Sequence, residues 1–430
     1  MKRLLILCLS VLLVVPTSAG ALEMDVSGVS NVWGLSQNNF FFGANNGNDN
    51  YVVQMHRLNA KFSDEDAPVK AITRLDLAQG WWGVDNAGDK DFDGGQFYNK
   101  NTFFDVHVDH AYLEFDVPDR LTRRQGLPEV TARVGRMHYA LGNKLVLDDD
   151  VDGLQFEVPV DERADFTLGV AKFTEGDDGA DTNANINTNR SQGLAQLNDN
   201  GANDDANMVM ANYTRNWKQS SLSSYYTYYY DNSYEDGTAY ITQGLGYHRP
   251  RFTPQVTQLN IVGLSGSTQW GNLHLTGEID YLVGKDEVDN DTSNFRRNDV
   301  NNGDLEGYTA YGDLRYDQKG GNIGLKVGIG SGDEDPTKGE GNITKLKTQG
   351  FFYFTEIWED SIMPDVGGIT PQGLGAPNTQ GYREFENTTA LQLYGSIKIS
   401  KYSSLFLSAS KMKATENVWS HEDVDRVLAG

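Results

Sequence analysis

Two acidic segments of the sequence have the spacing of a calcium-binding loop. In the first, Asp89, Asp91 and Asp93 are followed by Gly94, which is the D-x-D-x-D-G pattern that opens an EF-hand loop. An EF-hand also needs a glutamate at the twelfth position, where this sequence has Lys100. We therefore expect a solvated acidic loop, and we keep Asp89, Asp91 and Asp93 as a weak candidate for a looser Ca²⁺ site in an outer loop.

The second acidic segment repeats the pattern with Asp148, Asp150, Asp152 and Gly153. Its twelfth position is Pro159, which offers no side-chain oxygen, so this segment is not an EF-hand either. The sequence also has no glycine-rich phosphate loop before a helical segment. Apart from the loop Ca²⁺, no cofactor is expected.

The histidines are candidates for metal ligands and for catalytic bases. A strand predicted over residues 102–117 would place Asp105, His107 and Asp109 on one face and His110 on the other. The two histidines of this H-x-x-H spacing would then point apart, which argues against a shared metal. None of the seven histidines stands beside a serine and a carboxylate in strand register. An enzyme is therefore not expected.

Charged side chains recur at alternate positions of many predicted strands, so they would gather on one face of a sheet. The residues predicted to line a pore are Arg57, Lys61, Arg74, Asp76, Arg133, Arg136, Glu278, Asp313, Arg315, Lys326 and Lys398, and the same face also carries Glu114, Asp116 and Asp280. Opposed charges across a pore select solutes by charge. The alternative is a ladder of salt bridges between neighbouring strands. Arg133 and Arg136 have opposite parity, so both face the pore only if a bulge intervenes.

The strands that position these residues are identified by a period of two. Within residues 307–336, Leu314, Leu325 and Val327 alternate with Asp313 and Lys326. Comparable segments are 22–35, 50–63, 69–80, 102–117, 129–138, 151–160, 164–174, 206–217, 220–231, 256–269, 272–284, 305–317, 321–331, 385–399 and 402–413. They are long enough for tilted membrane-spanning strands, which need about 9–11 residues, whereas strands of soluble proteins average about 5–6.

The connections between these segments alternate in length. The short ones are 64–68, 161–163, 218–219, 270–271, 318–320 and 400–401, and the long ones are 36–49, 81–101, 175–205, 232–255, 285–304 and 332–384. Outer-membrane barrels have short turns at one end and long loops at the other. The pattern predicts an all-β fold: a transmembrane antiparallel up-and-down β-barrel with apolar residues such as Leu325 facing lipid. The loop at 139–150 is the weak member of the long series.

The first residues have the features of a secretory signal peptide. Lys2 and Arg3 precede an apolar segment, and Ala19-Gly20-Ala21 forms an A-x-A cleavage site. Cleavage there would remove the single cysteine, Cys8, and so exclude disulfides and cysteine metal sites from the mature chain. The formal charge of −24 argues against nucleic-acid binding, which favours a basic surface. The expected organisation is a signal peptide at 1–21 and an outer-membrane barrel at 22–430.

The last predicted strand, 402–413, is followed by a polar segment without a closing strand. Barrels of this kind have an even number of strands, and an open edge in lipid leaves backbone groups without partners. We therefore expect the complete barrel to have 16 or 18 strands, with about 15 visible and the C-terminal closing strands missing.

Two stretches resemble the alginate export family of outer-membrane barrels. The first is EVTARVGRMHYALGNKLVLDDDVDG at 129–153, with Arg133, Gly135 and Arg136 in an R-x-G-R arrangement and Asp152-Gly153 near its end. The second is SGDEDPTKGEG at 331–341, which resembles the S-G-D-x-x-P loop of that family. The resemblance implies a barrel in which arginines at the constriction, here Arg133 and Arg136, attract a polyuronate.

These observations together predict a channel in the Gram-negative outer membrane. Hydrophilic solutes, among them anions such as polyuronates or other small anions and sugars, would diffuse through a lumen shaped by charged side chains and infolded loops. The expected partners are outer-membrane lipid and lipopolysaccharide, the barrel-assembly machinery and a small solute, with no nucleic acid. The alternatives are a barrel that scaffolds or sheathes another envelope protein, an outer-membrane hydrolase, and a secreted lectin-like sandwich.

Overall fold

The computed structural model describes most of the predicted sheet but not the longest loops. The described residues are 22–37, 49–64, 67–81, 106–117, 130–174, 205–231, 256–286, 303–334, 340–348, 385 and 387–417. The predicted signal peptide at 1–21, the acidic Asp89, Asp91 and Asp93, and residues 418–430 lie outside them. The described residues contain no helix with the length and hydropathy needed to cross a membrane.

The described chain forms one sheet of seventeen strands. The long strands are β1 (Leu22–Gln37), β2 (Asp49–Asp64), β3 (Ala67–Trp81), β4 (Val106–Asp116), β5 (Thr131–Ala140), β6 (Leu147–Asp161), β7 (Ala164–Thr174), β8 (Ala206–Trp217), β9 (Ser220–Asp231), β10 (Gln258–Trp270), β11 (Leu273–Asp286), β12 (Gly303–Gln318), β13 (Gly321–Gly330), β16 (Thr388–Lys398) and β17 (Ser404–Ala414). Two short strands, β14 (Glu340–Asn342) and β15 (Lys347–Thr348), lie between β13 and β16 in the sequence.

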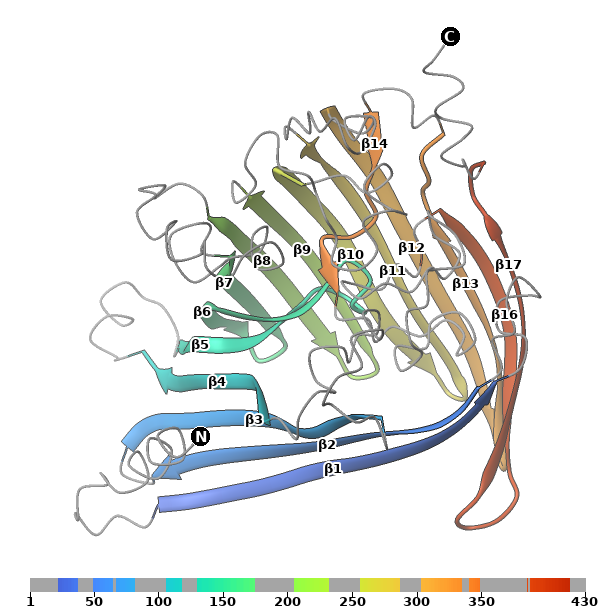
Figure 1. Ribbon diagram of the computed structural model, residues 1–430, viewed down its shortest axis with the longest axis horizontal. Helices are drawn as coiled ribbons and strands as arrows, with labels where there is room; N and C mark the ends of the chain where they lie inside the picture. Colours follow the sequence, from blue (N-terminus) through green and yellow to red (C-terminus); the bar gives the residue numbers. More distant parts are fainter. Residues whose placement is uncertain are drawn as a thin grey trace.

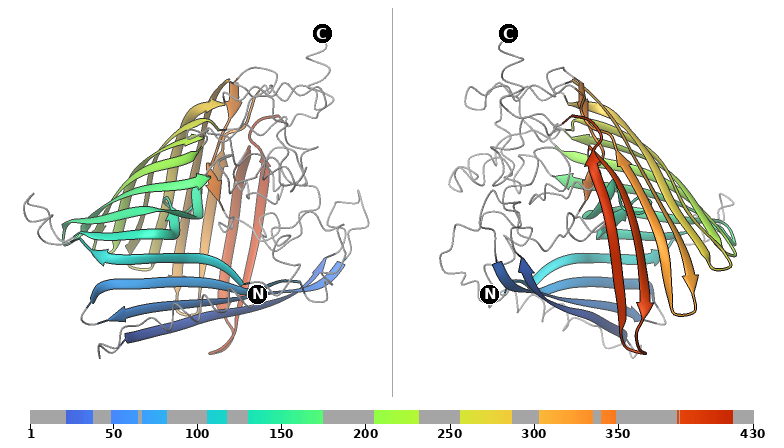
Figure 2. Two further views of the ribbon diagram at one scale, coloured as in Figure 1. Left: turned by 60° about the vertical axis from the view of Figure 1, so that its left-hand side comes forward. Right: turned by 90° about the vertical axis from the view of Figure 1, so that its right-hand side faces the viewer.

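Each long strand pairs antiparallel with the next, and β13 pairs with β16 across the intervening segment. The sheet curls around an interior, with β1 and β17 at its two ends (Figures 1 and 2). In the described part of the chain, β1 pairs with β2 alone and β17 with β16 alone. This is the up-and-down antiparallel arrangement of an outer-membrane-type barrel. The total of 16 or 18 strands stays a prediction.

The strand predictions are confirmed closely, because all fifteen predicted segments correspond to the long strands. The alternation of connections is confirmed as well, since the links after β6, β8, β10 and β12 are turns of two residues. The structure adds β14 and β15, which are too short to carry a recognisable period of two.

The two faces of the wall differ as the alternation predicts. An outward row of leucines crosses four strands, because Leu275 pairs with Leu314, Leu314 with Leu325, and Leu325 with Leu393. All four side chains are exposed, with exposed fractions of 39% to 54%. Charged residues such as Asp313 and Lys326 occupy the opposite face of the same strands, where they are partly buried. A wall with this apolar outer surface is suited to contact with the hydrocarbon of a membrane.

The interior is not simply a wet lumen, and here the expectation needs correction. Leu259, Ile261, Leu282 and Leu305, on the inner faces of β10, β11 and β12, are fully buried. They belong to a single hydrophobic cluster that also contains the hairpin of β5 and β6. At these residues the inner face of β10, β11 and β12 is therefore covered by other parts of the protein and not by water.

The outward row yields a prediction about lipid exposure. Replacing Leu325 by Arg should lower the free energy of unfolding by about 2–4 kcal/mol, because a charge near the bilayer midplane is poorly solvated. The control is Lys326→Arg, which keeps the charge of the neighbouring inward position and should change stability little. Denaturant titrations of folding into lipid vesicles measure both. Equal midpoints for the two variants would contradict the assignment of the faces.

Candidate functional site

The hairpin of β5 and β6 leaves the wall and enters the interior. β5 pairs with β4 only from Thr131 to Arg136, and β6 pairs with β7 only from Asp152 onward. Beyond these residues the two strands pair, among the described residues, only with each other and with the short β15. Figure 1 shows them reaching from the wall to the middle of the molecule. We call residues 137–151 the infolded hairpin.

Two glycines that face each other mark the start of the infolded hairpin. Gly135 pairs directly with Gly153. Gly135 has a φ of 124°, which residues with a Cβ rarely adopt. A Cβ at Gly153 would overlap the hydroxyl of Tyr139 and the carbonyl of Val170. These are the glycines of the R-x-G-R and Asp-Gly patterns in the sequence, so the patterns have a local structural reason that needs no solute.

The tip of the infolded hairpin docks on the inner face of β11. The backbone N–H of Asn143 donates to Glu278 Oε2, and a Cβ at Gly142 would overlap the same carboxylate. Two residues along β11, Asp280 accepts hydrogen bonds from the hydroxyl of Tyr225 at 2.6 Å and from that of Thr309 at 3.0 Å. Glu278 therefore binds the hairpin tip to β11, and Asp280 links β11 to β9 and β12 in the wall.

A segment of the longest connection packs beside the infolded hairpin. β15 pairs in parallel with Leu147 and Asp148 of β6, and β14 pairs in parallel with β12. Ser331, in the stretch that resembles the S-G-D-x-x-P loop, accepts a hydrogen bond from the backbone of Tyr308 and donates 2.6 Å to Asn342. This stretch thus anchors residues 340–348 to the wall.

One face of the infolded hairpin is apolar. Met137, Tyr139, Leu147 and Val151 are at most 4% exposed and pack into the hydrophobic cluster lined by β7 to β12. The Tyr139 hydroxyl donates to the carbonyl of Val170 at 3.0 Å, so the ring is held over β7. The burial of these side chains stabilises the hairpin in the interior.

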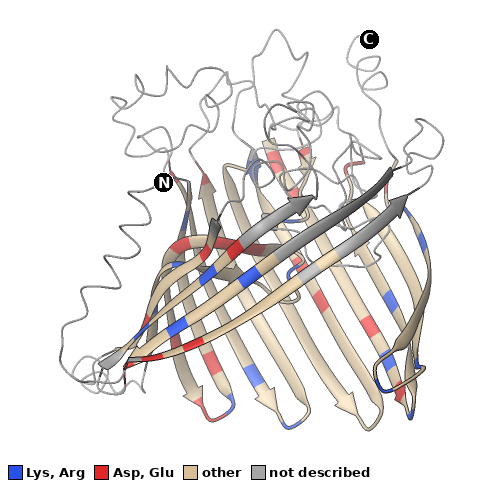
Figure 3. Cartoon of the chain, turned by 60° about the horizontal axis from the view of Figure 1, so that its bottom comes forward, with Lys and Arg blue, Asp and Glu red and all other residues tan. Residues whose placement is uncertain are grey.

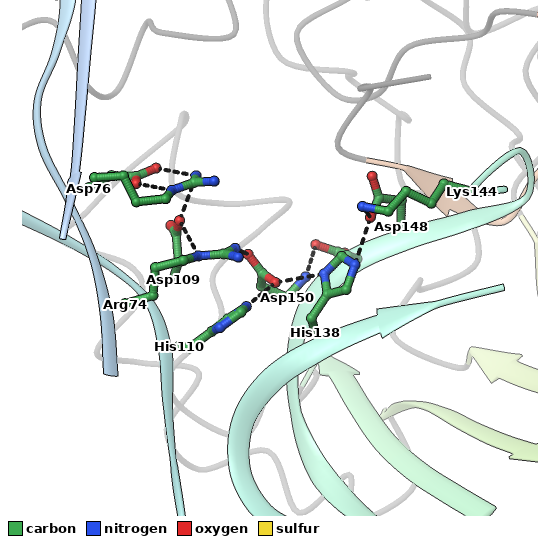
Figure 4. Close-up of polar contacts among 10 residues, drawn as sticks. Arg74, Asp76, Asp109, His110, His138, Lys144, Asp148 and Asp150 are labelled. Atoms are coloured by element: carbon green, nitrogen blue, oxygen red, sulfur yellow. Dashed lines mark hydrogen bonds and ion pairs between the residues drawn. The ribbon is translucent and has the colours of Figure 1, made fainter. Parts of the chain in front are cut away.

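The other face of the infolded hairpin meets a chain of ion pairs from β2, β3 and β4 (Figure 4). Arg57 donates to both oxygens of Asp76, at 2.6 and 2.9 Å, and to Asp109 at 2.9 Å. Arg74 joins Asp109 at 3.1 Å to Asp150 of the hairpin at 2.7 Å. The chain therefore runs from the wall to the hairpin without a break, and we call it the interior charge network.

The interior charge network also contains two histidines. Asp150 Oδ1 lies 2.8 Å from His110 Nε2 and 3.0 Å from His138 Nδ1. Asp148 Oδ1 lies 3.1 Å from His138 Nε2 and 2.9 Å from Lys144 Nζ. Figure 4 shows His110 approaching from the wall and His138 from the hairpin.

The prediction that His110 faces away from Asp109 is wrong. Arg74 pairs with His110 but the next residue, Leu75, pairs with Val108, so Asp109 is an extra residue in a β-bulge. The bulge turns both Asp109 and His110 toward the interior. Strict alternation cannot reveal such a bulge, which is why the sequence did not bring His110, His138 and Asp150 together.

The predicted pore arginine Arg133 is paired on both sides. Its guanidinium donates 2.9 Å to Glu114 and 3.0 Å to Glu157, and Lys70 donates 3.0 Å to the other oxygen of Glu114. The pairing of β4 with β5 has no register shift, so no bulge brings Arg136 to the face of Arg133. Arg136 instead lies 4.0 Å from Asp152, a residue exposed on the outer side of β6.

The other predicted pore residues lie on the inner faces of distant strands. Asp313 accepts 2.7 Å from the Tyr394 hydroxyl, and Lys326 lies 5.5 Å from the centre of the same ring. Arg315 is 3.0 Å from Asp317. Lys61 and Lys398 are exposed at the ends of β2 and β16 near the short turns. Their roles in lining a path for solutes stay predictions.

Positions of both charge signs are interspersed along the described strands (Figure 3). In the described interior of β2 to β6, every arginine named above lies within ion-pair distance of a carboxylate. This arrangement corresponds to the ladder of salt bridges between neighbouring strands, which is the alternative to side chains that select solutes by charge.

Comparison with known proteins gives structural likeness but no family. No family model matches the chain, and no curated protein matches it in sequence. Its resemblance to the alginate export family therefore stays a prediction. A BenF-like porin from Pseudomonas fluorescens Pf-5 has a TM-score of 0.46 and 13% identity, covering 93% of this chain and 84% of that chain. OccK8 (OprE) of Pseudomonas aeruginosa has a TM-score of 0.43 and 12% identity, covering 88% and 79%.

The bend of the hairpin yields a prediction about Gly153. Changing Gly153 to Ala should lower the free energy of unfolding by about 1–3 kcal/mol, because the new methyl overlaps a backbone carbonyl that cannot rotate away. It should also loosen the infolded hairpin and expose its tip to protease. The matched control is Gly277→Ala in β11, where the only close atom is Tyr311 O at 3.3 Å. Similar melting and cleavage of the two variants would contradict the tight approach at Gly153.

Proposed function

We propose that this chain is a channel of the Gram-negative outer membrane that lets small hydrophilic solutes diffuse through the barrel, with the infolded hairpin as the element that narrows the path. The observation that carries the proposal is the pairing of an apolar outer wall with an interior hairpin whose polar face is charged. A barrel that only enclosed space in the membrane would not require a hairpin bound inside it by contacts on both of the hairpin's faces.

The outer wall supports the membrane location. Exposed leucines, valines and isoleucines cover the outward side of the strands, and such residues are stable in hydrocarbon but not as a large surface in water. All backbone groups of a spanning segment must find partners within the protein, which paired strands provide. The predicted signal peptide would deliver the chain to the envelope.

The infolded hairpin supports the narrowing. It crosses from β4 on one side to Glu278 of β11 on the other, and its apolar face fills the inner side of β7 to β12. Solutes must therefore pass beside its polar face or along the inner faces of β12 to β17. Side chains on those faces, including Tyr311, Asp313 and Lys326, are partly buried and polar.

The charge preference of the proposed channel follows from the pairing of its arginines. Anions or polyuronates would meet an Arg133 that is already bonded to two carboxylates. Paired charges of both signs create a weaker distant field than a ring of one sign. The proposal therefore rests on size and hydrophilicity, and not on attraction of anions.

Removing the tip of the infolded hairpin tests the narrowing. Replacing residues 141–146 by two glycines should raise single-channel conductance in planar bilayers, because the tip would no longer reach β11. The control keeps the tip but replaces Val262, an outward residue of β10 that is 56% exposed, by Ala. An unchanged conductance in the tip variant would contradict the narrowing, and a folded wild-type barrel that does not conduct would favour a scaffold.

Ion selectivity tests the charge balance. Reversal potentials under a salt gradient should show no strong anion preference at about 0.1 M salt, where the screening length is about 10 Å. A strong anion preference that fades at about 1 M, where this length is about 3 Å, would show that unpaired basic residues attract anions over a distance. That result would support the arginine attraction that the family resemblance implied.

A further inference from the structure

We propose that His110, His138 and Asp150 form a binding site for one divalent transition-metal ion, with Zn²⁺ as the expected occupant. The site lies where the infolded hairpin meets β4, so the ion would join the hairpin to the wall. The inference goes beyond the proposed channel function and does not depend on it, because the three side chains are close whether or not solutes pass.

The donor atoms are already near the spacing that such an ion requires. One ligand atom from each of His110, His138 and Asp150 lies within 4.8 Å of the other two. Asp150 Oδ1 is 2.8 and 3.0 Å from the two nitrogens. Zinc bonds of about 2.0–2.1 Å in a tetrahedron place ligand atoms about 3.3 Å apart. To bind a tetrahedral ion, Asp150 Oδ1 would move a few tenths of an ångström away from each nitrogen, and the two imidazole nitrogens, which lie within 4.8 Å of each other, would close to about 3.3 Å.

The surroundings hold two of the ligands in the required orientation. Coordination through His138 Nδ1 leaves its proton on Nε2, and that nitrogen lies 3.1 Å from Asp148 Oδ1. A carboxylate in this position orients a metal-binding histidine and strengthens it as a ligand. Asp148 is itself fixed by Lys144 at 2.9 Å. Arg74 donates to Asp150 Oδ2 and leaves Oδ1 directed at the histidines.

The local charges allow a cation despite the nearby arginine. Within the interior charge network, four carboxylates face three permanent cations: Asp76, Asp109, Asp148 and Asp150 against Arg57, Arg74 and Lys144. With neutral histidines the network has an excess of one negative charge. The added ion would therefore enter a site with a net negative charge. In that site Asp150 Oδ2 is held by Arg74 and Asp150 Oδ1 faces the histidines.

The ligand types indicate the class of ion. Two imidazoles and one carboxylate suit Zn²⁺, Ni²⁺, Co²⁺ and Cu²⁺, whereas Ca²⁺ and Mg²⁺ prefer sites made of oxygen atoms. The side chain of His138 is 34% exposed while that of Asp150 is 4% exposed. A fourth ligand, such as water, can therefore reach the ion from the side of His138.

Metal titration of the full-length, untagged protein in detergent micelles tests the site. Calorimetry with ZnCl₂, and the visible absorption of added CoCl₂, should show one ion bound per chain. His110→Ala and His138→Ala should each weaken binding more than tenfold, and Asp148→Asn should weaken it by about 10- to 100-fold, as expected for loss of an orienting carboxylate. Binding of similar strength in wild type and both histidine variants, or no binding, would overturn the proposal.

A matched control separates this site from ordinary wall histidines. His274 lies 2.9 Å from Asp317 on the inner side of β11 and β12, and among the residues that the structure describes it belongs to no group of three potential metal ligands. His274→Ala should bind the ion as wild type does. Equal loss of binding in His274→Ala and His138→Ala would show that the ion is held elsewhere or by general charge, and the proposal would fail.

A second measurement uses the wild-type protein, so it does not depend on the folding of any variant. Diethyl pyrocarbonate modifies accessible histidines, and peptide mass spectrometry reports each position. Saturating ZnCl₂ should protect His138 from modification and leave His274 unchanged. Equal modification of His138 with and without ZnCl₂ would contradict the proposal.

Discussion

A hairpin that leaves a membrane-spanning wall must have both faces and its tip satisfied by the interior it enters, and this requirement organises the described structure. The paired glycines Gly135 and Gly153 begin the departure. Tyr139 and its apolar neighbours then fill the inner side of β7 to β12, and the tip is bound by Glu278. If any one of these three contacts were missing, buried polar backbone or an apolar face would be left without a partner.

The charged face of the hairpin explains why acidic and basic side chains are paired where β2, β3 and β4 face it. Arg74 bonds to Asp150 on the hairpin and to Asp109 on the wall, so it holds two separate elements together. Removing one member of such a buried pair leaves the other charge without compensation, which is costly. Arg74, which was predicted to line a pore, is thus engaged in positioning the hairpin, and in the proposed channel the position of the hairpin would shape the path.

The wall could be predicted from the sequence, whereas the interior could not. Alternation identified all fifteen long strands because lipid imposes the same period of two along each spanning segment. The alternation continues beyond Gly135, where Asp148 and Asp150 keep the parity of the exposed Asp152. Their surroundings change from the outer surface to the interior without any change in pattern. The bulge at Asp109 hid His110 for a similar reason, since one inserted residue reverses parity. The glycines of the R-x-G-R and Asp-Gly patterns were the available signal for the bend.

The position of the hairpin tip is the central claim, and a cross-link between Asn143 and Glu278 tests it most directly. With both residues changed to Cys and each single Cys variant as a control, mild oxidation of the folded protein in detergent should form an intramolecular disulfide. A folded double variant in which both thiols stay free and react readily with a bulky maleimide would show that the tip does not reach β11, and would contradict the account.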